Sequence, residues 1–91
     1  NDSFGLAAFR SRTQVLRMED ALHRAGLSAG VIATPREVAI GCGLSARFDL
    51  AQTPQVMQVY RRLNPGALIG FYRVEGYGTR HPVSYTHLTL P

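Results

Sequence analysis

The sequence contains no lysine and no tryptophan, and its 91 residues include a single cysteine, Cys42. One cysteine cannot form an internal disulfide, which excludes a disulfide-stabilised secreted domain. No apolar run approaches the roughly 18 residues that a membrane-spanning helix needs. The N-terminus also lacks the charged-then-apolar order of a signal peptide. We therefore expect a cytoplasmic protein with no membrane segment.

The ten basic residues are all arginine and outnumber the six acidic residues, giving a formal net charge of +4. They are scattered along the chain, whereas proteins that bind nucleic acids usually gather basic residues on one face. The charge is compatible with an anionic partner, but its distribution does not favour nucleic acid.

A chain of this length predicts one small domain with a single hydrophobic core. Residue 1 is Asn rather than Met, and we expect a truncated N-terminus. Residues 82–91, PVSYTHLTLP, resemble a translated sequencing-adapter read-through. Although Val83 and Tyr85 alternate as in a strand, we expect a non-native tail there and assign the domain to residues 1–81.

The first half of the chain predicts a strand followed by a helix. Residues 4–9, FGLAAF, are uncharged and read as a buried strand. Ser11 or Thr13 can then cap a helix that ends at Gly26. Apolar residues recur every three or four positions on one face of that helix, namely Val15, Met18, Leu22 and Ala25.

The second half predicts two strands, a helix and a last strand. Residues 29–34 are β-branched at their centre, and residues 44–48 alternate apolar and polar side chains. Thr53 can cap a helix closed by residues 64–66, and residues 67–74 form the last strand. The order β-α-β-β-α-β predicts an α+β, ferredoxin-like fold, with a four-stranded antiparallel sheet and two helices on one face.

Cys42 is the strongest candidate for a reactive residue. It lies between Gly41 and Gly43, which remove side-chain bulk and would let another molecule reach the thiol. A thiolate is a strong nucleophile, and Arg36 and Arg47 would favour the anion if they lie nearby. Arg47 is, however, expected on the sheet face without helices. The alternative is that Cys42 only fills core space, as free cysteines often do.

Other sites have weaker support in the sequence. His23, His81 and His87 show no paired spacing with a cysteine, so we expect no metal and no cofactor. Residues 41–43 give Gly-x-Gly without a third glycine, and a strand rather than a helix follows. RNA binding through the sheet would need a basic-glycine-aromatic run on the third strand, whereas that strand offers only Phe48, which we assign to the core.

The segment Pro35 to Asp49, PREVAIGCGLSARFD, resembles the bacterial family of Se/S carrier-like proteins. The matching positions are Pro35, Arg36, Val38, Cys42, Gly43, Leu44, Arg47 and Phe48. The segment MEDALHRAGLSAGVIATP is similar to the first helix and second strand of that family, and the resemblance covers about residues 4–74. The family pattern has small hydroxyl residues just before the cysteine, where this chain has Ala39, Ile40 and Gly41.

The resemblance implies a sulfur or selenium carrier that holds the atom as a persulfide-type adduct on Cys42. Gly41 and Gly43 would give access to the thiol, and Arg36 and Arg47 would favour its anion. Such a protein is a carrier rather than a turnover enzyme, with donor and acceptor proteins as partners. The cargo, the partners and the oligomeric state stay open. The alternative is a small binding or regulatory module for a protein or an anionic ligand, with RNA binding as a third hypothesis.

Overall fold

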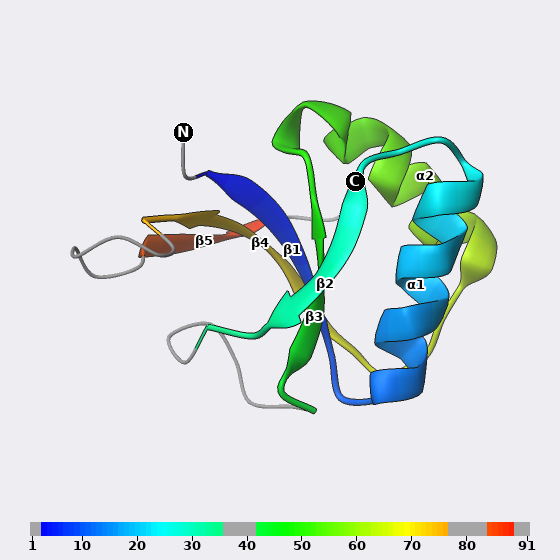
Figure 1. Cartoon of the computed structure of the whole chain (residues 1–91), viewed down its shortest axis with the longest axis horizontal. Coiled ribbons are helices and arrows are strands. Elements are labelled where there is room, and N and C mark those ends of the chain that lie inside the picture. Colours follow the sequence, from blue (N-terminus) through cyan, green and yellow to red (C-terminus); the bar gives the residue numbers. More distant parts are fainter. Residues whose placement is uncertain (1–2, 36–41, 77–83, 89–91) are drawn as a thin grey trace.

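The computed structural model describes residues 3–35, 42–76 and 84–88 (Figure 1). Its elements follow the chain as β1 (Phe4–Phe9), α1 (Arg12–Arg24), β2 (Ala29–Ala33), β3 (Leu44–Phe48), the 3-10 helix η1 (Leu50–Gln52), α2 (Thr53–Leu63), β4 (Leu68–Glu75) and β5 (Ser84–Leu88). The strands form one sheet in the order β2-β3-β1-β4-β5, and all neighbours are antiparallel. Both helices lie on the same side of this sheet (Figure 1).

The sheet has five strands, so the prediction of four strands is wrong. The additional strand, β5, lies within residues 82–91, and it pairs antiparallel with β4 from Phe71↔Leu88 to Glu75↔Ser84. The His87 ring lies 5.0 Å from the Tyr72 ring, which adds a side-chain contact between the two strands. That residues 82–91 are foreign to the natural protein stays a prediction.

Helix α1 confirms its predicted boundaries and three of the four residues of its predicted buried face. The fourth, Ala25, is exposed, because it follows the last helical residue as the C-cap. The Ser11 side chain accepts a hydrogen bond from the Gln14 N–H at 3.4 Å, as an N-cap residue does. At the other end, Gly26 has φ of +78°, the left-handed conformation that ends many helices. The buried residues of the helix are Val15, Met18 and Leu22.

Helix α2 begins differently from the prediction. Thr53 is the first helical residue rather than the cap, and its hydroxyl donates to the Leu50 carbonyl at 2.7 Å. The reason is that η1 runs directly into α2 and presents this carbonyl to the threonine. Asn64, with φ of +49°, ends the helix. Neither helix in the described parts of the chain has the length and apolar content of a membrane span.

The main core lies between the helices and the sheet. Its buried members are Ala7, Phe9, Val15, Met18, Leu22, Ala46, Phe48, Val56, Met57 and Phe71. The Phe71 ring makes edge contacts with Phe48 and Tyr60 at centroid distances of 6.3 and 5.1 Å. Gly5 allows the Phe48 ring to cross β1, because a Cβ at Gly5 would overlap that ring. Phe48 is therefore a core residue, as predicted.

A second cluster of buried residues lies on the opposite face of the sheet. It contains Phe4, Leu6, Ala8, Tyr72 and Val74, all at most 8% exposed. Every residue of β1 is consequently buried, on both faces of the sheet. This explains why the sequence of β1 is a continuous apolar run rather than an alternating one.

Candidate functional site

Cys42 lies at the entrance to β3, two residues before the strand begins. The side chain is partly exposed and packs against the edge of the main core rather than within it. It therefore combines the two environments that the sequence left as alternatives: the residue packs against apolar neighbours of the core and is not fully buried.

The thiol has one hydrogen-bond partner in the structure. Its Sγ–H donates to the Leu44 carbonyl at 3.4 Å, a weak contact with an acceptor two residues along the chain. The contact lies within the junction itself, because its acceptor belongs to the first residue of β3.

Gly43 supplies the backbone conformation of this junction. Its φ of +86° is one that residues with a side chain rarely adopt. A Cβ placed on Gly43 would have no heavy atom within 4 Å, and the residue is exposed. Its carbonyl accepts a hydrogen bond from the Thr34 N–H at 2.9 Å, which ties the end of β2 to the start of β3. Glycine is therefore needed here for φ, while the space around it is open.

The start of β3 lies beside the end of β1, and this brings Cys42 towards the first turn of α1. The Cys42 N–H donates to the Phe9 carbonyl at 3.5 Å. The helix cap, Ser11, is two residues beyond Phe9, at most about 7 Å along the chain. The first turn of α1 contains no acidic residue, and a helix N-terminus carries a partial positive charge that favours nearby anions.

We did not predict this helix terminus as part of the site. The predicted topology could have indicated it. An antiparallel pair of β1 and β3 places the start of β3, next to Cys42, against the end of β1, next to α1. Residue spacing alone directs attention to the arginines that flank Cys42 in the sequence.

Arg47 lies on the face of the sheet away from the helices, as predicted, and the structure does not bring it to Cys42. Its cross-strand partners are Leu6 and Gly30. Its guanidinium lies over the Phe4 ring, 4.2 Å from the centroid. Four residues of largely extended backbone lie between it and Cys42, and the two Cα atoms are up to about 16 Å apart. In the described part of the chain, the contacts of Arg47 are thus with the Phe4 ring and its strand neighbours, and none is with Cys42.

Two further predicted site residues, Arg36 and Gly41, lie outside the described residues. Their roles beside Cys42 stay predictions.

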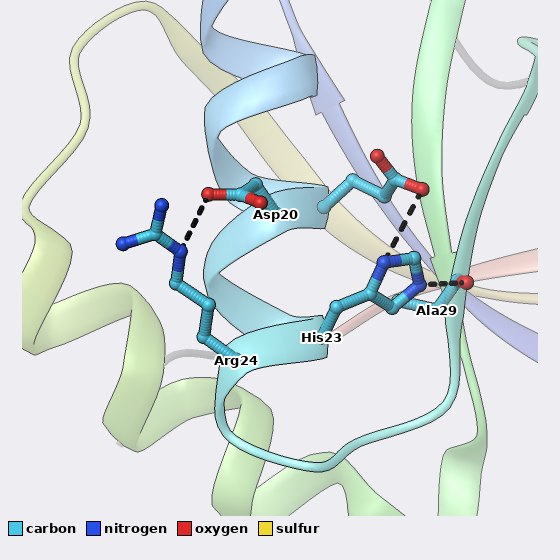
Figure 2. Close-up of polar contacts among 5 residues, drawn as sticks. Asp20, His23, Arg24 and Ala29 are labelled. Carbon is cyan, nitrogen blue, oxygen red and sulfur yellow. Dashed lines mark hydrogen bonds and ion pairs between the residues drawn. The ribbon is translucent and has the colours of Figure 1, made fainter.

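Both ring nitrogens of His23 contact other residues of the fold (Figure 2). Its Nε2 donates to the Ala29 carbonyl at 2.7 Å, and its Nδ1 lies 3.7 Å from a Glu19 carboxylate oxygen. The neighbouring pair Asp20 and Arg24 forms a separate exposed ion pair at 2.9 Å. His23 thus connects the end of α1 to the start of β2. Across the residues that the structure describes, no three His, Cys, Asp or Glu side chains gather as metal ligands would.

Comparison with known proteins identifies the family. A family model described as "Putative Se/S carrier protein-like" matches residues 4–65. That range contains both helices, the first three strands and Cys42. No curated protein and no solved structure matches the chain. Since the matched range covers well over half of the sequence, the chain belongs to the Se/S carrier protein-like family.

Proposed function

We propose that this protein carries sulfur or selenium as an adduct on Cys42. The observation that carries the proposal is the position of the thiol. It is partly exposed at a loop-to-strand junction, within the range that the family model matches. A cysteine fully enclosed in the core would be protected from every partner, whereas Cys42 is not fully enclosed.

The proposed loading step is a thiol exchange with a donor persulfide. The Cys42 thiolate attacks the outer sulfur of the donor, so a sulfur–sulfur bond forms at Cys42 while the donor's own sulfur–sulfur bond breaks. The electron pair of that bond leaves with the donor sulfur as a thiolate, which takes up the proton that Cys42 gave up. The sulfane sulfur keeps its oxidation state, so no external oxidant or reductant is needed. With a selenium-bearing donor, the same exchange would give a Cys42–S–SeH adduct.

The number of thiols suits a relay. A second cysteine in the chain could attack the Cys42 persulfide and release its outer sulfur as the chain forms an internal disulfide, but the sequence has only one. The adduct would then persist until an acceptor thiolate from another molecule attacks its outer atom. This supports a carrier with separate donor and acceptor proteins rather than a reductase.

We also propose that β1 to β4 and the two helices form the ferredoxin-like arrangement, with β5 added at one edge. The strand order β2-β3-β1-β4 with antiparallel neighbours supports this assignment, as does the position of both helices on one face. RNA binding has less support, because the aromatic rings Phe4 and Tyr72 on the other face are 3% and 8% exposed. Such rings cannot stack on bases without rearrangement.

Intact-mass spectrometry tests the proposal directly. The native protein is exposed to a sulfane-sulfur donor, with Cys42→Ser as the matched variant. We expect the parent to gain one sulfur atom that a reductant removes, and the variant to gain none. A native protein that stays unmodified, while its thiol reacts after unfolding in urea, would contradict the proposal. The binding-module alternative would then remain.

A further inference from the structure

A pocket of about 380 Å³ opens at the far end of β3 from Cys42. Its walls come from the starts of β1 and β2 and from the end of β3 and the residue after it. The lining residues are Ser3, Phe4, Ser28, Ala29, Gly30, Arg47, Phe48 and Asp49. The pocket thus holds one cationic and one anionic side chain.

Arg47 is positioned in this pocket by an aromatic ring rather than by an ion pair. Its guanidinium lies 4.2 Å from the centre of the Phe4 ring, a cation–π contact that orients the planar group. It forms no ion pair or hydrogen bond with any residue in the described part of the chain. Its five N–H donors are therefore available to a ligand, and their fork matches a carboxylate.

Asp49 provides the opposite charge on the same side of the chain. Its backbone is extended, with φ of −75° and ψ of 126°. Residues two apart on extended backbone point the same way, about 6.6 Å from each other. One carboxylate oxygen, Oδ1, accepts from the Ala51 N–H at 3.0 Å. The structure gives Asp49 no ion pair with Arg47 or with any other described residue, which leaves Oδ2 as an acceptor.

Gly30 keeps the space beside Arg47 open. The two residues face each other across β2 and β3. A Cβ on Gly30 would find no heavy atom within 4 Å, so a larger side chain there would extend into open space without displacing the backbone.

We propose that this pocket binds a free α-amino acid, with its carboxylate on Arg47 and its ammonium group on Asp49. A simple anion would meet the like charge of Asp49, and a simple cation would meet that of Arg47. A small molecule that bears both charges satisfies both side chains at once. The site is separate from the proposed chemistry at Cys42 and does not depend on it.

Amide NMR spectra of the full chain, recorded during a titration with L-serine, test the proposal. We expect saturable shifts centred on Gly30, Arg47 and Asp49 in both the parent and Cys42→Ser. Acetate and ethylammonium, which carry one charge each, should bind at least tenfold more weakly. Shifts that do not saturate, or acetate that binds as well as L-serine, would overturn the assignment.

Four variants separate a binding site from a general surface effect. Gly30→Val fills the pocket, Arg47→Gln removes the cation, and Asp49→Asn keeps the acceptor for Ala51 while removing the anion. Each should weaken L-serine binding at least tenfold while the amide spectrum stays that of a folded protein. Arg24→Gln removes an exposed arginine elsewhere, paired with Asp20, and should leave binding unchanged. Parent-like affinity in Gly30→Val, or equal losses in Arg24→Gln and Arg47→Gln, would overturn the proposal.

Discussion

The two ends of β3 differ in the chemistry that they present. At its start, Cys42 offers a nucleophile beside an open glycine junction, with the first turn of α1 nearby. At its end, Arg47 and Asp49 offer opposite charges around a pocket. The five-residue strand keeps the thiol and the charged groups apart. Residues close in sequence are thus held apart when extended backbone lies between them.

The glycines that flank β3 are expected to differ in their effect on stability, because a Cβ would meet the Phe48 ring at Gly5 and open space at Gly30. Gly5→Ala should lower the free energy of unfolding by about 3 kcal/mol, since the new Cβ would overlap the buried Phe48 ring. Urea denaturation followed by circular dichroism measures the change. Gly30→Ala is the matched control and should change the free energy by less than about 1 kcal/mol. Equal effects of the two substitutions would contradict the close packing of β1 against β3.

The polar contact between β2 and β3 gives the next largest effect. Ser45 is fully buried, and its hydroxyl hydrogen-bonds with that of Thr34. Thr34→Val should cost about 1–2 kcal/mol, because it leaves a buried hydroxyl without this partner. Thermal or urea unfolding measures the loss.

The double variant Thr34→Val, Ser45→Ala provides the control for that pair. Removing both hydroxyls should cost less than the sum of the two single changes. Strict additivity would show that the pair contributes no coupling.

The start of β3 depends on the left-handed backbone at Gly43. Gly43→Ala should destabilise the fold by about 1 kcal/mol, since φ is +86° there. Gly43→Asn should lose less, because asparagine tolerates this conformation better than alanine. Unfolding in urea ranks the three proteins. A larger loss for asparagine than for alanine would point to lost space rather than to backbone strain.

The smallest expected effect concerns the distance between Arg47 and Cys42. Arg47→Gln should change the labelling rate of native Cys42 by less than about twofold, because charges farther apart than about 8 Å are largely screened at physiological salt. Stopped-flow labelling with a disulfide reagent gives the rate. A many-fold slower reaction would show that Arg47 acts on the thiol after all, and the contrast between the two ends of β3 would fail.

Local patterns predicted most of the fold. The spacing of Val15, Met18 and Leu22 is sufficient to identify the buried face of α1, and Gly26 marks its end. Both signals lie within one element and need no knowledge of distant residues. The strand β5 was missed because the resemblance of residues 82–91 to a read-through led us to exclude them, although their alternation is typical of a strand.

The site was predictable only in part. Cys42 could be identified because it is the only thiol and lies between glycines. Its neighbours in space could not be read from spacing, since strand pairing rather than sequence distance decides them. Pairing of β3 with β1 places Cys42 beside Phe9, and extension along β3 carries Arg47 to the Phe4 ring.

The most direct test of the account is the unloading of Cys42. The protein is loaded with sulfur, separated from the donor, and mixed in its native state with an acceptor thiol. Its mass is then followed in time. We expect the loss of one sulfur atom from Cys42, recovery of the starting mass, and appearance of that sulfur on the acceptor. A loaded native protein that keeps its sulfur, and yields it only after unfolding, would contradict the carrier function.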